Sequence, residues 1–270
     1  MSATKDRGEK TRGQKNREKR MSLGEHLIEL RKRLFISAIA IVLGGVLGWV
    51  LTDLFVWEAI QEPVYRVAEA RDDQTSIIFP TISSAFDLRL QIALTLGIVI
   101  SSPVWLYQIF AFLVPGLNTK ERKFTFAFFA TAIPLFFAGC AAGWFVLPNI
   151  VKLMTGFVPE GGASLLTAKE YIDFVLKLVV AIGIAFVVPV FLVLLNFAGI
   201  LSAAALIKSW RIAILVIVLF TAIATPSADV VSMFMLAIPM IGLYFAAWGI
   251  AHLHDKRVER RNRLEFGAAV

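Results

Sequence analysis

The stretch Gly24-Glu25-His26-Leu27-Ile28-Glu29-Leu30-Arg31-Lys32-Arg33-Leu34 lies directly before the first long apolar run of the chain. Its leucines recur at helical spacing, which predicts a short amphipathic helix at a membrane interface that leads into a span. Ser22 and Glu25 fit a capping box at the start of that helix. A plain membrane anchor needs the basic residues but has no need for Glu29, so the stretch also indicates a binding function.

The composition indicates an integral membrane protein. The chain has 270 residues, of which 58% are hydrophobic, and its mean hydropathy is +0.74. Soluble domains contain about 45–50% apolar residues, so this chain is far more apolar. The single cysteine, Cys140, lies inside an apolar run and is interpreted as a small packing residue, with a reactive thiol as the alternative.

Apolar runs predict an all-α protein with six transmembrane helices. The predicted segments are approximately 34–52, 90–114, 124–150, 171–198, 212–225 and 230–251. The fifth segment is shorter than a typical span, and a re-entrant segment is the alternative; a short span keeps both termini on one side. Prolines fall within or near the ends of the spans at positions 103, 134, 148, 189 and 239. Because each proline permits a kink, they predict a concave, kinked bundle.

The basic residues predict the orientation of this bundle. The segments on the side of the two termini carry 21 of the 27 Lys and Arg residues, and the opposite segments carry Arg66, Arg71, Lys152 and Lys169. Lys and Arg mark the cytoplasmic side of membrane proteins. Both termini are therefore predicted to be cytoplasmic.

The chain outside the spans divides into three predicted parts. Residues 1–21 form a disordered basic cytoplasmic extension, residues 22–252 the membrane domain, and residues 253–270 a basic cytoplasmic tail. The first external segment, about 53–86, is acidic and is predicted to form short helices interrupted at Pro63 and Pro80.

No sequence motif indicates an enzyme: the chain has no Gly-rich phosphate loop, no Cys-x-x-Cys and no nucleophile elbow. His252 and His254 fit a helix-dipole or interfacial pair better than metal ligands. Two pairs near the outer ends of spans, Asp87 with Arg89 and Asp173 with Lys177, are interpreted as neutralised charges. A proton relay is the alternative, and it would make the protein a proton-coupled transporter of a small solute.

Glu29 and Glu121 are the strongest binding candidates, because both lie among basic residues on the predicted cytoplasmic side. A carboxylate accepts an arginine in a charge-assisted and geometrically selective pair. The alternative is local pairing, such as Glu29 with Arg33 four residues later. Tyr107, Phe110 and Phe112 precede Glu121 and form either an interfacial aromatic belt or an apolar pocket beside the acid. Asp229, in the short turn before the last span, is interpreted as a helix N-cap or a functional polar residue.

The motifs of this chain resemble those of the TatC family, the multi-spanning receptor subunits of the twin-arginine protein translocase. The resemblance runs in order over about residues 22–252. It is carried by His26-Leu27-Ile28-Glu29-Leu30-Arg31-Lys32-Arg33-Leu34, Ser102-Pro103-Val104, Leu106-Tyr107-Gln108, Ala111-Phe112, Pro115-Gly116-Leu117, Glu121-Arg122, Thr225-Pro226 with Asp229, and Leu236-Ala237-Ile238-Pro239.

The resemblance implies a receptor for signal peptides that carry paired arginines on folded cargo proteins. It assigns Glu29 and Glu121 to the acidic positions of the cytoplasmic face and Phe112 to a signal-recognition aromatic position. Arg31, Pro63 and Pro103 match further positions that are important in the family. The implied partners are the single-span subunits TatA and TatB and further TatC copies, in the cell membrane. Transport would draw on the proton-motive force, with no cofactor, ATP or metal.

The chain departs from the family pattern at two polar positions. A carboxylate is common in the fourth span where this chain has Val187, and a polar residue is common early in the sixth span where it has Met233. Roles in partner docking or membrane thinning that are ascribed to these positions are therefore not expected of these two residues.

A structural membrane scaffold is a third possible class of function. For a scaffold, neutralising both Glu29 and Glu121 would have no effect.

Overall fold

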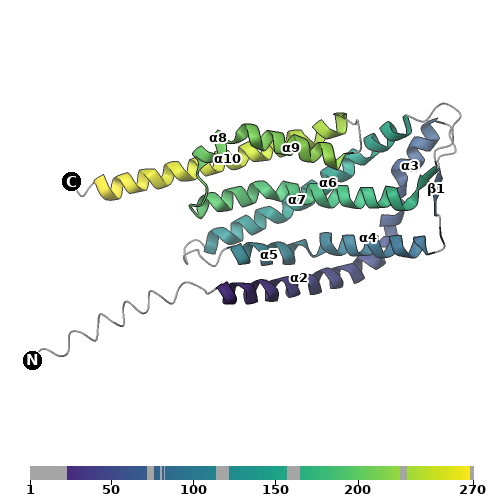
Figure 1. Cartoon of the computed structure of the whole chain (residues 1–270), viewed down its shortest axis with the longest axis horizontal. Helices are drawn as coiled ribbons and strands as arrows, with labels where there is room; N and C mark the ends of the chain where they lie inside the picture. The colour runs from purple at the N-terminus through teal and green to yellow at the C-terminus, as the bar shows by residue number, and fades with distance from the viewer. Residues whose placement is uncertain are drawn as a thin grey trace, which may run out of the picture.

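The computed structural model describes residues 23–71, 76–79, 81, 83–113, 122–156, 165–225 and 230–267, and this part of the chain is almost entirely helical. The elements in chain order are α2 (Leu23–Leu51), the π-helix η1 (Thr52–Val56), α3 (Trp57–Arg71), β1 (Ser76–Ile78), α4 (Ser84–Ile100), α5 (Ser102–Leu113), α6 (Arg122–Gly156), β2 (Leu165–Thr167), α7 (Ala168–Phe197), α8 (Ala203–Lys208), α9 (Trp210–Ala224) and α10 (Val230–Gly267). The long helices lie side by side (Figure 1).

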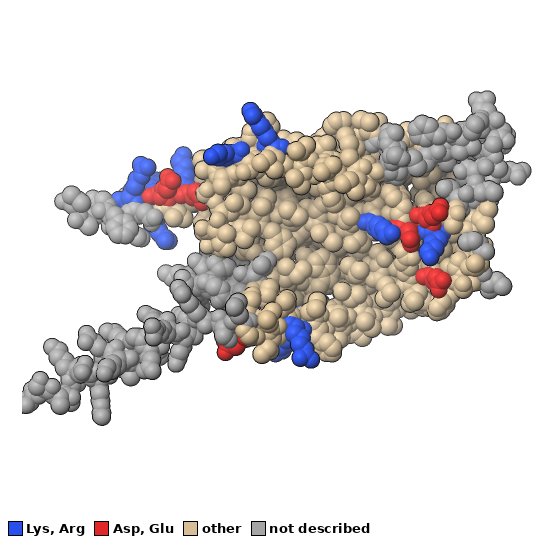
Figure 2. All heavy atoms as spheres, in the orientation of Figure 1, with Lys and Arg blue, Asp and Glu red and all other residues tan. Residues whose placement is uncertain are grey.

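Five of the six predicted apolar segments each correspond to one helix, and the segment 90–114 is divided between α4 and α5. Four helical stretches are long and apolar enough to cross a membrane: Gly24–Arg66, Phe128–Leu153, Ala168–Phe197 and Val230–Arg261. The bent pair of α4 and α5 counts as a fifth if it forms one span, and α9 is a shorter apolar helix. On the face shown in Figure 2, charged side chains gather toward the two ends of the molecule. This distribution is typical of a multi-pass membrane protein.

The helix before the first span is not a separate element. The amphipathic stretch and the apolar run form the single helix α2, which begins at Leu23 among the described residues. Ser22 lies outside them. Because no Pro or Gly separates the charged cluster from the apolar run, the helix continues without a break. Glu29 is therefore placed rigidly relative to the span.

The external segment also differs from the prediction. The chain continues from α2 through the π-helix η1 into α3, and Pro63 lies buried inside α3 rather than interrupting it. Pro80 lies outside the described residues. The all-helical prediction has one exception: β1 and β2 pair in parallel, with Ser76 opposite Leu165. The pairing satisfies backbone groups of two extended segments that would otherwise need other partners.

Two glycines, Gly97 and Gly139, let neighbouring helices approach closely. A Cβ atom built on Gly97 of α4 would lie 2.6 Å from the carbonyl oxygen of Ile41 in α2. A Cβ atom on Gly139 of α6 would lie 2.8 Å from the carbonyl oxygen of Ile182 in α7. Small residues at such crossings increase van der Waals contact between membrane helices. The α2–α4 contact therefore holds the helix of Glu29 against the bundle.

The helix bends by 54° between α4 and α5, next to Pro103. Pro103 has no N–H to continue the α4 hydrogen-bond ladder. The Trp105 indole Nε1 donates to the Ile98 carbonyl oxygen at 2.8 Å and satisfies one acceptor at the bend. The bend directs α5 toward the start of α2, where it meets the candidate binding residues.

Candidate functional site

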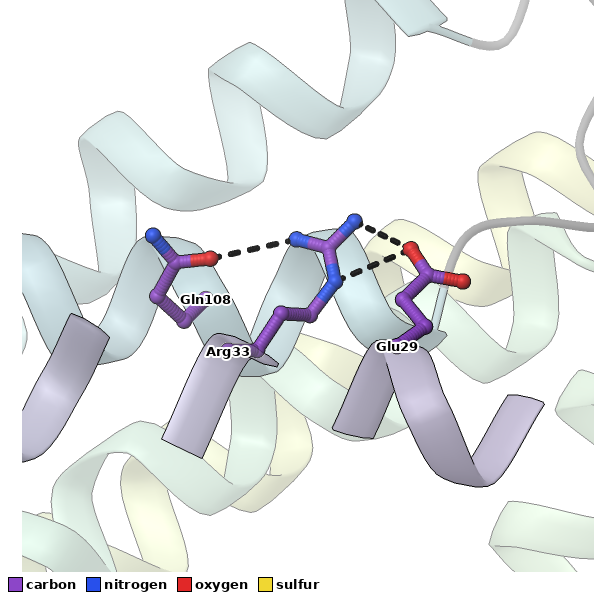
Figure 3. A network of polar contacts seen from close by, with 3 residues as sticks. All are labelled: Glu29, Arg33 and Gln108. Carbon is purple, nitrogen blue, oxygen red and sulfur yellow. Dashed lines mark hydrogen bonds and ion pairs between the residues drawn. The ribbon is translucent and has the colours of Figure 1, made fainter. Parts of the chain in front are cut away.

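Glu29 belongs to a three-residue network at the start of α2 (Figure 3). Arg33 donates through Nε at 3.0 Å and through Nη2 at 2.5 Å, both to Oε1 of Glu29. The remaining Nη1 of Arg33 donates to Oε1 of Gln108 on α5 at 3.2 Å. The predicted local pair of Glu29 and Arg33 is thus present, and a residue from another helix supports it.

The second carboxylate oxygen of Glu29 is different. Oε2 is buried and has no hydrogen-bond partner among the described residues. The Glu29 side chain as a whole is 21% exposed and that of Arg33 22%. A buried carboxylate oxygen without a donor is costly, so this oxygen is suited to accept a hydrogen bond from a ligand.

Phe112, near the end of α5, stacks on His26 of α2 with ring centroids 4.3 Å apart and an interplanar angle of 16°. His26 lies three residues before Glu29, which places the two side chains on neighbouring positions of one helix face. Sequence reasoning assigned Phe112 to the site but not His26 or Gln108. Their contacts arise between helices, and no periodicity within one helix predicts them.

The other predicted residues lie in different places. Arg31 is exposed, and it lies two residues after Glu29, a spacing at which side chains on a helix do not face each other. Tyr107 is 50% exposed and packs edge-on against Phe129, with ring centroids 5.6 Å apart. Glu121 and Asp229 lie outside the described residues.

The ion pairs at the other end of the bundle are partly rearranged. Arg89 does not pair with Asp87; it pairs with Asp53 in η1 and lies over the Trp49 ring of α2 at 4.4 Å. Residues two apart on a helix do not face each other, which explains why the predicted Asp87–Arg89 pair does not form.

The predicted pair of Asp173 and Lys177 is present. Asp173 accepts a hydrogen bond from Gln91 at 2.5 Å through Oδ1, and its Oδ2 lies 3.8 Å from Nζ of Lys177. The contact between Gln91 and Asp173 joins α4 to α7. The hydrogen bond from Gln91 fixes the carboxylate and the Lys177 ammonium offsets its charge, which supports the structural interpretation of this pair.

Val187 occupies the position where the family pattern has a carboxylate. It is 2% exposed in the apolar cluster of α5, α6 and α7. An ionised group at that position would be buried without a partner, at high cost. The apolar residue therefore suits the packing of this bundle.

Asp255 joins three elements at the end of the molecule where α10 leaves the bundle. Its Oδ1 accepts from Nδ2 of Asn196 at 2.9 Å, and its Oδ2 accepts from the backbone N–H of Ala203 at 2.8 Å, at the start of α8. Nearby, His254 stacks on Phe197, and His252 stacks on Trp248. The two histidines therefore each pack against an aromatic ring.

We expect Asp255→Ala to loosen this junction. The substitution removes the acceptor of two hydrogen bonds, and such charge-assisted bonds contribute about 1.5–3 kcal/mol each. Hydrogen exchange of the α8 amides should become faster than in the unaltered protein, while exchange in α2 stays the same. Equal exchange in α8 would contradict the assigned role of Asp255.

Together, the apolar helices and the cluster of Glu29, Arg33, His26 and Phe112 at one end define a multi-pass membrane protein with a candidate site at the bundle end. The family model described as "Sec-independent protein translocase protein (TatC)" matches residues 25–239. This chain belongs to the TatC family.

Similar proteins span most of the chain. A Sec-independent protein translocase protein TatC of Xylanimonas cellulosilytica is 41% identical over 245 residues, covering 91% of this chain and 88% of that protein. The chloroplastic protein of Pisum sativum is 32% identical and covers 86% of this chain and 64% of that protein. A crystal structure of the twin-arginine translocase receptor TatC matches with a TM-score of 0.69 at 32% identity, covering 85% of this chain and 99% of that one. A crystal structure of a twin-arginine translocase receptor TatC in DDM matches with a TM-score of 0.71 at 33% identity, covering 84% of this chain and 99% of that one.

Proposed function

We propose that this chain is the receptor subunit of a twin-arginine protein translocase. It binds signal peptides with paired arginines on folded cargo proteins. Glu29 accepts one arginine and Glu121 the other, with Phe112 beside them. The observation that carries the proposal is the buried Glu29 Oε2, which has no partner among the described residues. Family membership agrees with it.

We further propose six membrane crossings in a concave bundle with both termini in the cytoplasm. Figure 1 places the start of α2 and the end of α10 at the same end of the molecule, which supports an even number of crossings. The excess of Lys and Arg near both termini supports the orientation. The site then faces the cytoplasm, from which cargo arrives.

Recruitment of partners follows from this role. The outer surface of α9 and the start of α10 exposes large apolar side chains, among them Leu215, Leu219 and Ile223. In the proposed mechanism, single-span TatA and TatB subunits pack near these two helices, and the proton-motive force drives transport. The protein acts by binding and assembly, not as an enzyme.

The test is binding of a fluorescent twin-arginine signal peptide to the purified protein, compared with a twin-lysine peptide. We expect the arginine peptide to bind at least about tenfold more tightly, a difference of about 1.4 kcal/mol. Glu121→Gln should reduce that preference, because it removes one proposed arginine acceptor. Equal binding of both peptides, with and without TatA and TatB present, would contradict the receptor function.

A further inference from the structure

The contact between His26 and Phe112 is the least expected feature of the site. Both side chains are half-buried, and their rings stack at 4.3 Å between two helices that are far apart in sequence. A second histidine pair, His252 on Trp248, lies on α10 with ring centroids 5.8 Å apart. The His26 contact differs from it because His26 lies one helical turn from the candidate acceptor Glu29.

Glu29 lies one helical turn after His26 and one turn before Arg33 on α2. Arg33 donates two hydrogen bonds to Oε1 of Glu29. Figure 3 shows the other oxygen, Oε2, pointing away from Arg33. Because His26 lies one turn before Glu29, the side away from Arg33 is the side of His26 and Phe112.

Charge by itself gives this site little power to select a cation. Arg33 already neutralises Glu29, and Gln108 adds no charge. The Glu29–Arg33 pair therefore has no net charge to attract the arginine or lysine of a ligand. It offers only one hydrogen-bond acceptor, Oε2 of Glu29. Preference for arginine over lysine must come from the shape of the ligand and from what lies beside Oε2.

We propose that His26 is a specificity-determining residue of the site. Phe112 stacks on one face of the His26 ring, and one guanidinium of the ligand lies along the opposite face of this ring while it donates to Oε2 of Glu29. This inference rests on the proposed function. Since Arg33 occupies Oε1, the site takes a single guanidinium, and the second arginine binds elsewhere.

The chemistry of the two cations explains the selectivity. A guanidinium is planar and weakly hydrated, so it stacks on aromatic faces while its edge donates hydrogen bonds. An ammonium group is compact and strongly hydrated, and it has no plane to lie along a ring. The face of the His26 ring therefore favours arginine, whereas the carboxylate oxygen accepts either cation.

The experiment measures the affinities of twin-arginine and twin-lysine signal peptides for the full-length protein and its variants. His26→Ala removes the ring, His26→Phe keeps a ring without the imidazole nitrogens, and His26→Gln keeps polarity without a ring. His252→Ala is the matched control, because it removes a stacked histidine away from Glu29. Thermal unfolding of every variant verifies that the fold is retained.

We expect His26→Ala and His26→Gln to lower the affinity for the arginine peptide by about five- to tenfold, with little change for the lysine peptide. His26→Phe and His252→Ala should keep the ratio of the two affinities. An unchanged ratio in His26→Ala, or loss of the ratio in His26→Phe, would overturn the inference. If the unaltered protein does not distinguish the two peptides, the proposed function itself fails, which is a different result.

Discussion

The substitution Glu29→Lys is expected to weaken binding of a twin-arginine peptide by about 100-fold or more. It removes the buried acceptor Oε2 and places a cation next to Arg33, which is only 22% exposed. Truncation of one partner of a buried charge pair costs about 2–5 kcal/mol, and each 1.4 kcal/mol is about tenfold in affinity. The measurement is a peptide titration followed by fluorescence anisotropy.

Glu25→Lys provides the control for Glu29→Lys. Glu25 is exposed one turn earlier on the same helix, so its reversal changes the net charge equally. We expect it to change the affinity by only a few-fold, since long-range effects between exposed charges are screened by salt. Equal losses in the two variants would mean that general electrostatics, not an acceptor site at Glu29, attracts the peptide.

Arg33→Gln separates the receptor function from a merely local role of Glu29. If Glu29 serves only to pair with Arg33, removing either partner should have the same effect on the protein. If Glu29 accepts the ligand, Arg33→Gln frees Oε1 and leaves the carboxylate without its internal cation. Arg33→Gln should then increase the affinity for the peptide, whereas Glu29→Lys decreases it.

The substitution Gly97→Leu is expected to prevent the native packing of the bundle. Even the Cβ atom alone would lie 2.6 Å from two backbone atoms of α2, the Ile41 carbonyl oxygen and the Gly45 nitrogen. Backbone atoms within a packed helix cannot move aside separately, so α2 and α4 must separate. Overpacking in tight cores costs about 1–3 kcal/mol and occasionally more, and Gly97→Ala should fall in that range. Gly97→Leu should exceed it and yield little folded protein.

Gly249→Ala is the matched control for Gly97→Ala. Both glycines lie inside helices, but a Cβ atom on Gly249 would have nothing within 4 Å. Alanine in a helix interior is favoured over glycine by about 0.5–1 kcal/mol, so Gly249→Ala should raise the thermal unfolding temperature slightly. Thermal unfolding in detergent, followed by size-exclusion chromatography, measures both. A lowered unfolding temperature in both variants would mean that close approach at Gly97 is not the cause.

The predictions for Glu29→Lys and Gly97→Leu are linked, because both depend on the position of α2. Arg33, which holds Glu29, reaches Gln108, and His26 reaches Phe112, only because α2 lies against α4 and α5. The glycine contact fixes that distance, and the 54° bend next to Pro103 turns α5 toward the start of α2. A variant that separates α2 from α4 should therefore also lose peptide binding, even though it leaves every site residue unchanged.

The amino-acid sequence by itself determined the apolar helices, the acidic and basic stretch before the first span, and the family resemblance that the comparisons confirmed. These features are local or ordered along the chain, so hydropathy, helical spacing and motif order are sufficient to predict them. The local pair of Glu29 and Arg33 is of the same kind, because four residues make one helical turn.

Only the tertiary structure decided which side chains meet across helices. It replaced the predicted Asp87–Arg89 pair by Arg89 with Asp53, and it brought Gln108 and Phe112 to the first turns of α2. It also showed that Pro63 lies within a helix and that two short strands, β1 and β2, pair in parallel. Such contacts depend on the rotation and separation of whole helices. These are set by backbone approach at glycines and by bends, which the pattern of side chains along one helix does not encode.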